Sequence, residues 1–219
     1  MLGAGLGWTL LWSWALAAEP VCVPMAPPEG FVAVSSLGEG VGVNARYHGV
    51  DNFTGKALPG YEAPELWVRA EVGHALLRAA AVLEPQGYGL EVLDGYRPVR
   101  ATRAMVDWAR STDQSHLLTD GYIAARSGHN HGHTVDLTLV GRVDGAAVDM
   151  GSPFDHFGPE SHHGAEVGSE AMAARKVLAE AMKSAGFRPY SKEWWHYRLP
   201  VEDTVPLDVV IGCRSAATP

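Results

Sequence analysis

The sequence predicts a single α+β domain in which an antiparallel sheet is flanked by helices. Short segments of strand-like composition occur together, separated by three stretches with helical periodicity. The strand-like segments do not alternate regularly with the helical stretches, as the strands and helices of a doubly wound parallel sheet would. The chain has 219 residues, of which 47% are hydrophobic and 19% charged. That is enough for one substantial hydrophobic core, and we expect residues 19–219 to form one domain.

Residues 1–18 have the composition of a signal peptide. An uncharged apolar run from Leu6 to Leu16 overlaps Ala15-Leu16-Ala17, which matches the A-x-A cleavage pattern. The run is short for a membrane span. It also lacks the usual N-terminal Lys or Arg, which leaves an uncleaved anchor or a misassigned start codon as alternatives. We expect the mature chain to be exported, periplasmic or secreted, without stable membrane association after cleavage.

The chain contains only two cysteines, Cys22 and Cys213. Neither has a neighbouring Cys or His at metal-ligand spacing, which argues against a zinc or catalytic role. In an oxidising compartment we expect one disulfide that joins the two ends of the domain. In the cytosol both would be free thiols.

Local patterns in the N-terminal half predict few regular elements. Residues 20–42 are rich in Pro, Gly and Ser, and only 31–35 has strand-like composition. Residues 46–56 read as a strand running into a turn. A helix is predicted over 63–83, because apolar residues recur there at intervals of three and four: Leu66, Ala70, Leu77, Ala80 and Leu83. Residues 90–93 form a short strand.

The C-terminal half contains the clearest elements. Pro98 can open a second helix that carries Met105, Val106, Trp108 and Ala109, since proline is tolerated in a first turn. Residues 135–140 alternate as a half-buried strand. Residues 169–185 are predicted to form a third helix, with Ala174, Val177, Leu178, Ala181 and Met182 facing inward. The last strands are predicted at 188–190 and 194–199.

The net charge of −8 argues against a nucleic-acid partner or an anionic membrane surface. Binding to phosphate normally requires clustered Lys and Arg, and the sequence has no such cluster. A small zwitterionic ligand is compatible with this charge, because its recognition depends on a few local groups.

Three histidines and one aspartate fall within residues 129–136, His-Asn-His-Gly-His-Thr-Val-Asp. Catalytic zinc needs three imidazole or carboxylate ligands and one open position. We expect this segment to supply two ligands and the segment Glu193-Trp-Trp-His196 to supply the third. Glu193 would also provide a general base. Because residues three apart on a regular strand face opposite sides, we expect an irregular backbone at Glu193, at the start of its strand.

The motif Asp94-Gly-Tyr-Arg97-Pro98 follows a predicted strand and places an arginine at its end. Arg97 could polarise a scissile carbonyl group or stabilise an oxyanion. The alternative is an ordinary surface ion pair.

Taken together, these motifs resemble the D-alanyl-D-alanine dipeptidases of the vancomycin-resistance type, over most of the mature chain. The family pattern S-x-H-x-x-G-x-A-x-D is met by Ser127, His129, Gly132 and Asp136, with Thr134 in place of the usual Ala. Other shared segments are Arg46–Lys56, Gly60–Glu62, Gln86–Gly89, Asp94–Pro98, Asp136–Leu139, Met150–Asp155, Ser161–His163 and Glu193–Tyr197.

The resemblance implies a hedgehog/D,D-peptidase-like fold and the hydrolysis of D-alanyl-D-alanine. It implies one Zn²⁺ per subunit, held by His129, Asp136 and His196. Glu193 would be the catalytic acid and base, and Arg97 would stabilise the transition state. Substrate binding would involve Tyr47, Ser127 and Asp155, with Asp155 meeting the free ammonium group of the dipeptide.

Other interpretations of the same residues remain. His131 and His133 fit no family position, so we expect them to be solvent-facing or to lie behind the ligands. Trp194 and Trp195 are expected in the core. The alternative functions are a zinc D,D-carboxypeptidase or L,D-peptidase acting on peptidoglycan stem peptides, and a non-catalytic zinc-containing binding module. The sequence leaves the oligomeric state and the biological role open.

Overall fold

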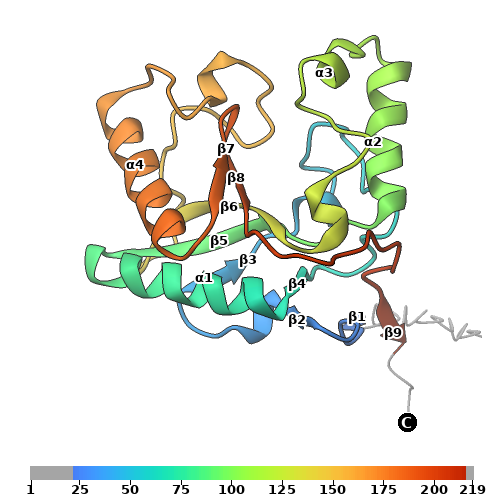
Figure 1. The fold of residues 1–219 in the computed structure, drawn as a ribbon, viewed down its shortest axis with the longest axis horizontal. Coiled ribbons are helices and arrows are strands. Elements are labelled where there is room, and N and C mark those ends of the chain that lie inside the picture. The colour runs from blue at the N-terminus through green and yellow to red at the C-terminus, as the bar shows by residue number, and fades with distance from the viewer. Residues whose placement is uncertain (1–21, 216–219) are drawn as a thin grey trace, which may run out of the picture.

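The computed structural model describes residues 22–215, which form the predicted α+β fold (Figure 1). The α-helices in this part of the chain are α1 (Ala70–Leu83), α2 (Val99–Ser111), α3 (His116–Thr119) and α4 (Ser169–Ser184). None of the helices formed by the described residues combines the length and apolar composition needed to cross a membrane. The predicted signal peptide, residues 1–18, lies outside the described residues.

A five-stranded sheet forms the centre of the molecule, in the order β3-β5-β6-β8-β7. Its strands are β3 (Val41–Val43), β5 (Tyr88–Asp94), β6 (Thr134–Gly141), β7 (Arg188–Tyr190) and β8 (Glu193–Arg198). The pairs β5–β6, β6–β8 and β7–β8 are antiparallel as predicted, but β3 and β5 are parallel. The chain forms α1 between β3 and β5, and a crossover of this kind returns the next strand in the same direction.

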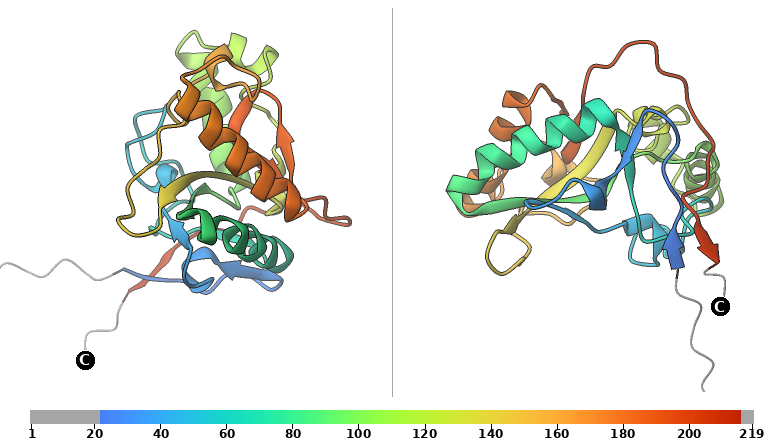
Figure 2. Two further views of the ribbon diagram at one scale, coloured as in Figure 1. Left: turned by 90° about the vertical axis from the view of Figure 1, so that its left-hand side faces the viewer. Right: turned by 90° about the horizontal axis from the view of Figure 1, so that it is seen from below.

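Helices α1 and α4 pack against each other and against strands of the sheet, whereas α2 and α3 lie on the opposite side of the molecule (Figures 1 and 2). Helix α1 begins at Ala70, not at residue 63 as predicted. The residues before it form β4 (Trp67–Arg69), which pairs with β2 (Phe31–Ala33). The buried face of α1 includes Val72, Leu76, Ala79 and Leu83. Leu77, assigned to the predicted apolar face, is 37% exposed.

The prediction of a strand within residues 46–56 is wrong. The chain there forms a short 3₁₀ turn, Arg46–His48, followed by further turns. The side-chain amide of Asn52 donates hydrogen bonds to the carbonyl oxygens of Gly49 (2.8 Å) and Lys56 (2.9 Å). Such side-chain bonds offer the backbone an alternative to a strand ladder.

The remaining predicted elements are confirmed with small shifts. Helix α2 follows Pro98, and α4 ends one residue before the predicted end. The strand predicted at 135–140 is β6. Its residues from Thr134 to Leu139 are all buried, whereas the prediction was that they would be alternately buried and exposed. It lies between β5 and β8 and has packing partners on both faces, and strands covered on both faces lose the alternating pattern.

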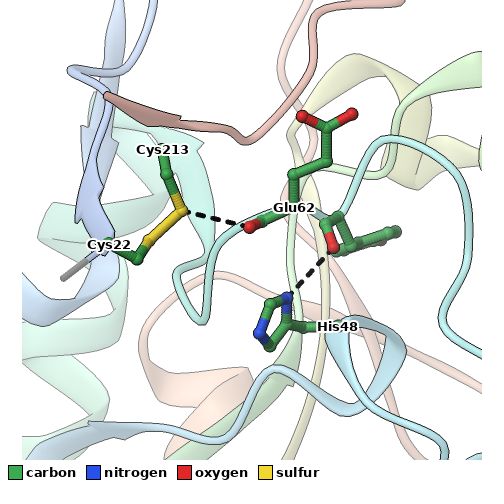
Figure 3. The surroundings of a disulfide bond; sticks show 5 residues. Cys22, His48, Glu62 and Cys213 are labelled. Carbon is green, nitrogen blue, oxygen red and sulfur yellow. Dashed lines mark hydrogen bonds between the residues drawn. A yellow bond between two sulfur atoms is a disulfide. The ribbon is translucent and has the colours of Figure 1, made fainter. Parts of the chain in front are cut away.

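The two ends of the described chain lie side by side and are joined by a disulfide. Strands β1 (Cys22–Pro24) and β9 (Cys213–Ser215) form an antiparallel pair, and Cys22 and Cys213 form the expected disulfide (Figure 3). Between β8 and β9 the chain runs along the molecule without regular structure (Figure 2). Its Leu207 N–H donates to the Asn130 carbonyl, and the Val99 N–H donates to the Leu207 carbonyl. The disulfide therefore tethers a segment that contacts the start of α2 and the turn Gly128–His131.

Candidate active site

Three polar residues lie in a row across the central sheet. The strand register pairs Asp94 on β5 with Asp136 on β6, and Asp136 with His196 on β8. Residues paired across neighbouring strands project from the same face of a sheet. Asp94 and Asp136 are both buried. The sheet thus gathers two carboxylates and one imidazole from three distant parts of the chain.

His129 reaches this row from a 3₁₀ turn, Gly128–His131. The hydroxyl group of Ser127 caps the turn by accepting a hydrogen bond from the His129 N–H. Gly132 follows in the left-handed region at φ +74°, and a Cβ atom there would overlap the ring of Phe31. Only glycine combines this backbone angle with the space available, which accounts for the glycine of the motif.

His129, Asp136 and His196 form a compact cluster. One ligand atom from each lies within 4.8 Å of the other two. His129 Nε2 is 3.3 Å from Asp136 Oδ2, and His196 Nδ1 is 3.0 Å from Asp136 Oδ1. Despite this short distance, buried Asp136 Oδ1 has no partner of acceptable hydrogen-bond geometry among the described residues. Two imidazole nitrogens and a carboxylate facing a common point are a donor set suited to zinc.

Asp94 contacts three of its neighbours, His129, Tyr61 and Arg97. It lies 3.3 Å from His129 Nδ1, which is also 2.8 Å from the carbonyl oxygen of Gly95. With both acceptors on the Nδ1 side, the Nε2 lone pair faces the cluster, an arrangement typical of histidine ligands. Asp94 also accepts a hydrogen bond from Tyr61 at 2.6 Å. Sequence reasoning assigned Asp94 no role, although a carboxylate three residues before Arg97 was the available signal.

Glu193 is the first residue of β8. The register of β7 and β8 shifts directly after it, because Tyr190 pairs with Glu193 whereas the preceding Pro189 pairs with Tyr197. The predicted irregular backbone is confirmed. The carboxylate Oε2 lies 3.4 Å from His196 Nδ1, so Glu193 faces the cluster although it lies three residues from His196. Burial, followed by the charges of Asp136 and Asp155, raises the pKa of Glu193 well above its usual range. A carboxylate with a raised pKa beside the cluster is suited to accept a proton.

Arg97 is held beside the cluster by Asp94. Its Nε and Nη2 atoms lie 2.9 and 2.8 Å from Asp94 Oδ2, and Nη2 lies 3.6 Å from Asp136 Oδ2. The guanidinium group also lies over the ring of Tyr47, 5.2 Å from its centroid. Burial alone would lower the pKa of Arg97, but the charges of Asp94, Tyr47, Tyr61 and Asp136 together outweigh burial, and the pKa is raised. The group therefore stays cationic, and its neighbours hold it in one orientation.

Tyr47 and Asp155 form a second polar group. The Tyr47 hydroxyl lies 3.1 Å from both carboxylate oxygens of Asp155. Burial, followed by the charge of Asp136, raises the pKa of Asp155 well above its usual range. The raised pKa means that burial and nearby negative charge destabilise the ionised carboxylate. A cation bound beside Asp155 would stabilise this ionised form.

These groups line one cavity of about 250 Å³. The structure brings to it all eight residues singled out from the sequence: Tyr47, Arg97, Ser127, His129, Asp136, Asp155, Glu193 and His196. Apolar walls come from Phe53, Met105, Phe157 and Trp195. Such a cavity suits a small ligand.

The other residues considered from the sequence lie outside the cluster. His131 and His133 stack on each other, and His131 Nδ1 lies 3.0 Å from the Thr204 hydroxyl. Burial, with smaller effects of nearby charges, lowers the pKa of His133 to about 4. Trp194 and Trp195 are buried in the core as predicted, although Trp195 also forms part of the cavity wall.

Comparisons with known proteins agree with this picture. A family profile described as D-ala-D-ala dipeptidase matches residues 28–210. The chain is 37% identical over 184 residues to a D-alanyl-D-alanine dipeptidase of Enterococcus faecium, covering 78% of this chain and 91% of that protein. A D-alanyl-D-alanine dipeptidase of Streptomyces coelicolor is 38% identical over 186 residues, covering 78% of this chain and 92% of that protein.

Solved structures give weaker matches. The LdcB LD-carboxypeptidase is 21% identical with a TM-score of 0.43, and the match covers 61% of this chain and 59% of that one. VanYB in complex with D-alanine-D-alanine is 17% identical with a TM-score of 0.41, and the match covers 64% of this chain and 75% of that one. Both scores are low, so membership of a family depends on the sequence relatives.

Proposed function

The chain belongs to the D-alanyl-D-alanine dipeptidase family, and on this basis we propose that it is a zinc-dependent enzyme that hydrolyses D-alanyl-D-alanine to two D-alanine molecules. One observation carries the proposal. A His-Asp-His donor set, a buried glutamate and an arginine meet in a single small cavity. This combination provides for both the metal and the proton transfer that hydrolysis of a peptide bond requires.

His129, Asp136 and His196 would hold one zinc ion per chain. The unpartnered Asp136 Oδ1 and the orientation of His129 by Asp94 and Gly95 support this assignment. When bound, zinc supplies Lewis-acid chemistry: it acidifies water and polarises a carbonyl oxygen. Three protein ligands leave room for such chemistry, in contrast to a closed structural site with four.

Glu193 would accept a proton from the attacking water and return it to the leaving amine. Its raised pKa and its position 3.4 Å from His196 Nδ1 support both roles. Arg97, kept cationic by Asp94, would stabilise negative charge as it develops on the carbonyl oxygen. A free carboxylate base beside the donor set also argues against the non-catalytic zinc module.

Asp155 would bind the ammonium group of the substrate, with Tyr47 holding the carboxylate in place. A substrate with a blocked amino group would leave this buried anion without a cationic partner, at a cost in binding free energy. This favours a dipeptidase over a carboxypeptidase or L,D-peptidase that acts on longer stem peptides. Ser127, which lines the same cavity, would contribute to substrate binding.

We also propose that the enzyme is exported. The disulfide between Cys22 and Cys213 supports this, because such bonds persist in oxidising compartments such as the periplasm or the extracellular space.

A substrate panel tests the proposed function. The purified protein is assayed with D-Ala-D-Ala, L-Ala-L-Ala, L-Ala-D-Ala and N-acetyl-D-Ala-D-Ala, before and after treatment with a chelator and after zinc is restored. We expect the free D,D-dipeptide to be the best substrate, with activity lost on chelation and recovered with zinc. A preference for the acetylated peptide would contradict the dipeptidase assignment, and full activity without metal would contradict the zinc assignment.

A further inference from the structure

Residues 150–162, here called the Asp155 loop, contribute Asp155 and Phe157 to the cavity. Only one short 3₁₀ turn, Pro159–Ser161, interrupts its irregular course. Asp155 itself has a φ angle of +60°, in the left-handed region that favours glycine. A non-glycine residue keeps such a conformation only where the surrounding structure enforces it. The loop therefore needs a partner that holds it.

Arg175 of α4 is that partner. Its Nε donates to the Met150 carbonyl at 2.6 Å, and Nη1 donates to the His162 carbonyl at 3.0 Å. Its Nη2 donates to the Glu160 carbonyl at 2.8 Å and to the Ser152 hydroxyl at 3.2 Å. One guanidinium group thus binds both ends of the Asp155 loop, on either side of Asp155.

The loop is also connected to the catalytic strand. The Ser152 hydroxyl, which accepts from Arg175, also accepts a hydrogen bond from Trp194 Nε1 at 3.0 Å. Trp194 is adjacent to Glu193 on β8, and the Arg175 guanidinium carbon lies 5.8 Å from its ring centroid. Arg175 therefore holds the Asp155 loop against the strand that carries Glu193 and His196.

Arg175 is only 4% exposed, and none of the ion pairs formed among the described residues includes it. Burial lowers its pKa, and the more distant charge of Asp149 offsets this only in part. A buried cation without a directly paired anion is costly, and an apolar residue would fill the same space at a lower cost. Its hydrogen bonds go to backbone and hydroxyl oxygens of one loop. Their shared effect is to hold that loop in position.

We propose that Arg175 is a positioning residue for substrate recognition: it holds the Asp155 loop so that the Asp155 carboxylate stays against Tyr47 in the cavity. The inference rests on the proposed function, because it assigns Asp155 to the substrate ammonium group. Arg175 does not touch the reacting atoms. Its loss should therefore weaken substrate binding much more than the chemical step.

Kinetics of the zinc-loaded Arg175→Met and Arg175→Lys proteins test this. For D-Ala-D-Ala we expect KM to rise by roughly 10- to 100-fold in Arg175→Met, because the loss of a supporting contact lets the substrate-binding group shift. We expect kcat to change much less and zinc content to stay constant. Arg175→Lys, which keeps the charge, should recover part of the loss. Lys176→Met, at the exposed neighbouring position, is the matched control.

A purely structural role would reduce the amount of active protein, lowering apparent kcat without changing KM. If Arg175→Met does not fold, Ser152→Ala removes one acceptor of Arg175 more gently and should raise KM in the same direction. Unchanged KM in the variants, with the unaltered enzyme active, would overturn the role of Arg175 alone. Failure of the unaltered protein to hydrolyse D-Ala-D-Ala would overturn the proposed function and this inference with it.

Discussion

Two sets of polar groups that line the cavity are held in different ways. Asp136 and His196 are paired residues of neighbouring strands, and Glu193 begins one of those strands, so the backbone ladder of the sheet sets their spacing. Asp155 lies on an irregular loop, and its place depends on side-chain hydrogen bonds made by Tyr47 and Arg175. We call the first set the sheet-held group and the second, Tyr47 and Asp155, the loop-held group.

This difference separates two tasks. A sheet holds side chains more precisely than a loop does, and groups that transfer protons or bind a metal tolerate little displacement. Recognition of an ammonium group by a carboxylate tolerates more, because charge attraction depends less steeply on geometry. We therefore expect substitutions in the sheet-held group to reduce kcat, and substitutions in the loop-held group to raise KM.

The largest effect should follow from Glu193→Gln, which removes the proposed base but keeps the shape of the side chain. We expect kcat to fall by about 100- to 10,000-fold, the usual contribution of a general acid or base. Zinc content, measured by metal analysis, should remain one per chain, because Glu193 is not among the three donor residues. Glu180→Gln, on the exposed surface of α4, is the control. Unchanged turnover in Glu193→Gln would show that the base is another group.

A smaller effect is expected for Asp94→Asn. Asp94 contacts both His129 and Arg97, so its neutralisation should disturb the orientation of each. We expect kcat/KM to fall by about 10- to 100-fold and zinc to bind more weakly, as for other carboxylates that orient a histidine ligand. Asp107→Asn, at an exposed position of α2, controls for the loss of one charge. Normal zinc affinity and activity in Asp94→Asn would leave Asp94 with a purely structural role.

Tyr47→Phe tests the loop-held group. It removes the hydroxyl that lies 3.1 Å from both oxygens of Asp155 and keeps the ring. We expect KM for D-Ala-D-Ala to rise about tenfold, since a hydrogen bond to a charged group typically contributes about 1.5 kcal/mol or more. The value of kcat should stay nearly constant. A large decrease in kcat with constant KM would contradict the division into two groups.

The smallest effect concerns stability and the residue that follows the Asp155 loop. Burial, with a smaller contribution from Arg175, lowers the pKa of His163 from 6.5 to about 4. The unfolded chain therefore binds more protons between these pH values, and the free energy of unfolding should rise with pH from about 4 to 6.5. One proton contributes at most about 1.4 kcal/mol per pH unit, and partial exposure reduces this value.

In His163→Phe this contribution to the slope should disappear, while an aromatic ring stays against Tyr197. Denaturant titrations at several pH values measure the slope. The curves of the two proteins should run parallel above about pH 7, where the histidine is neutral in both the folded and the unfolded state. An identical slope below pH 6.5 would contradict the lowered pKa.

Much of this molecule could be predicted from local sequence. Helix α2 could be located because Pro98 precedes a run with helical periodicity, and α4 because apolar residues recur until Gly186. The density of histidine and aspartate in residues 129–136 indicated a metal, and the spacing of Glu193 and His196 required an irregular start to β8. These features depend on residue type and on neighbours within a few positions, which the sequence displays directly.

Other features depend on contacts between residues far apart in the chain. The row Asp94, Asp136 and His196 exists only because β5, β6 and β8 pair in one register. The four hydrogen bonds of Arg175 also depend on residues far from it in the chain. Nothing in the composition of α4 shows that an inward-facing arginine has partners there. Residue types along the chain thus determined which chemistry was available, whereas the tertiary structure decided which groups meet. Strand register and burial are set by long-range packing, and no local pattern encodes them.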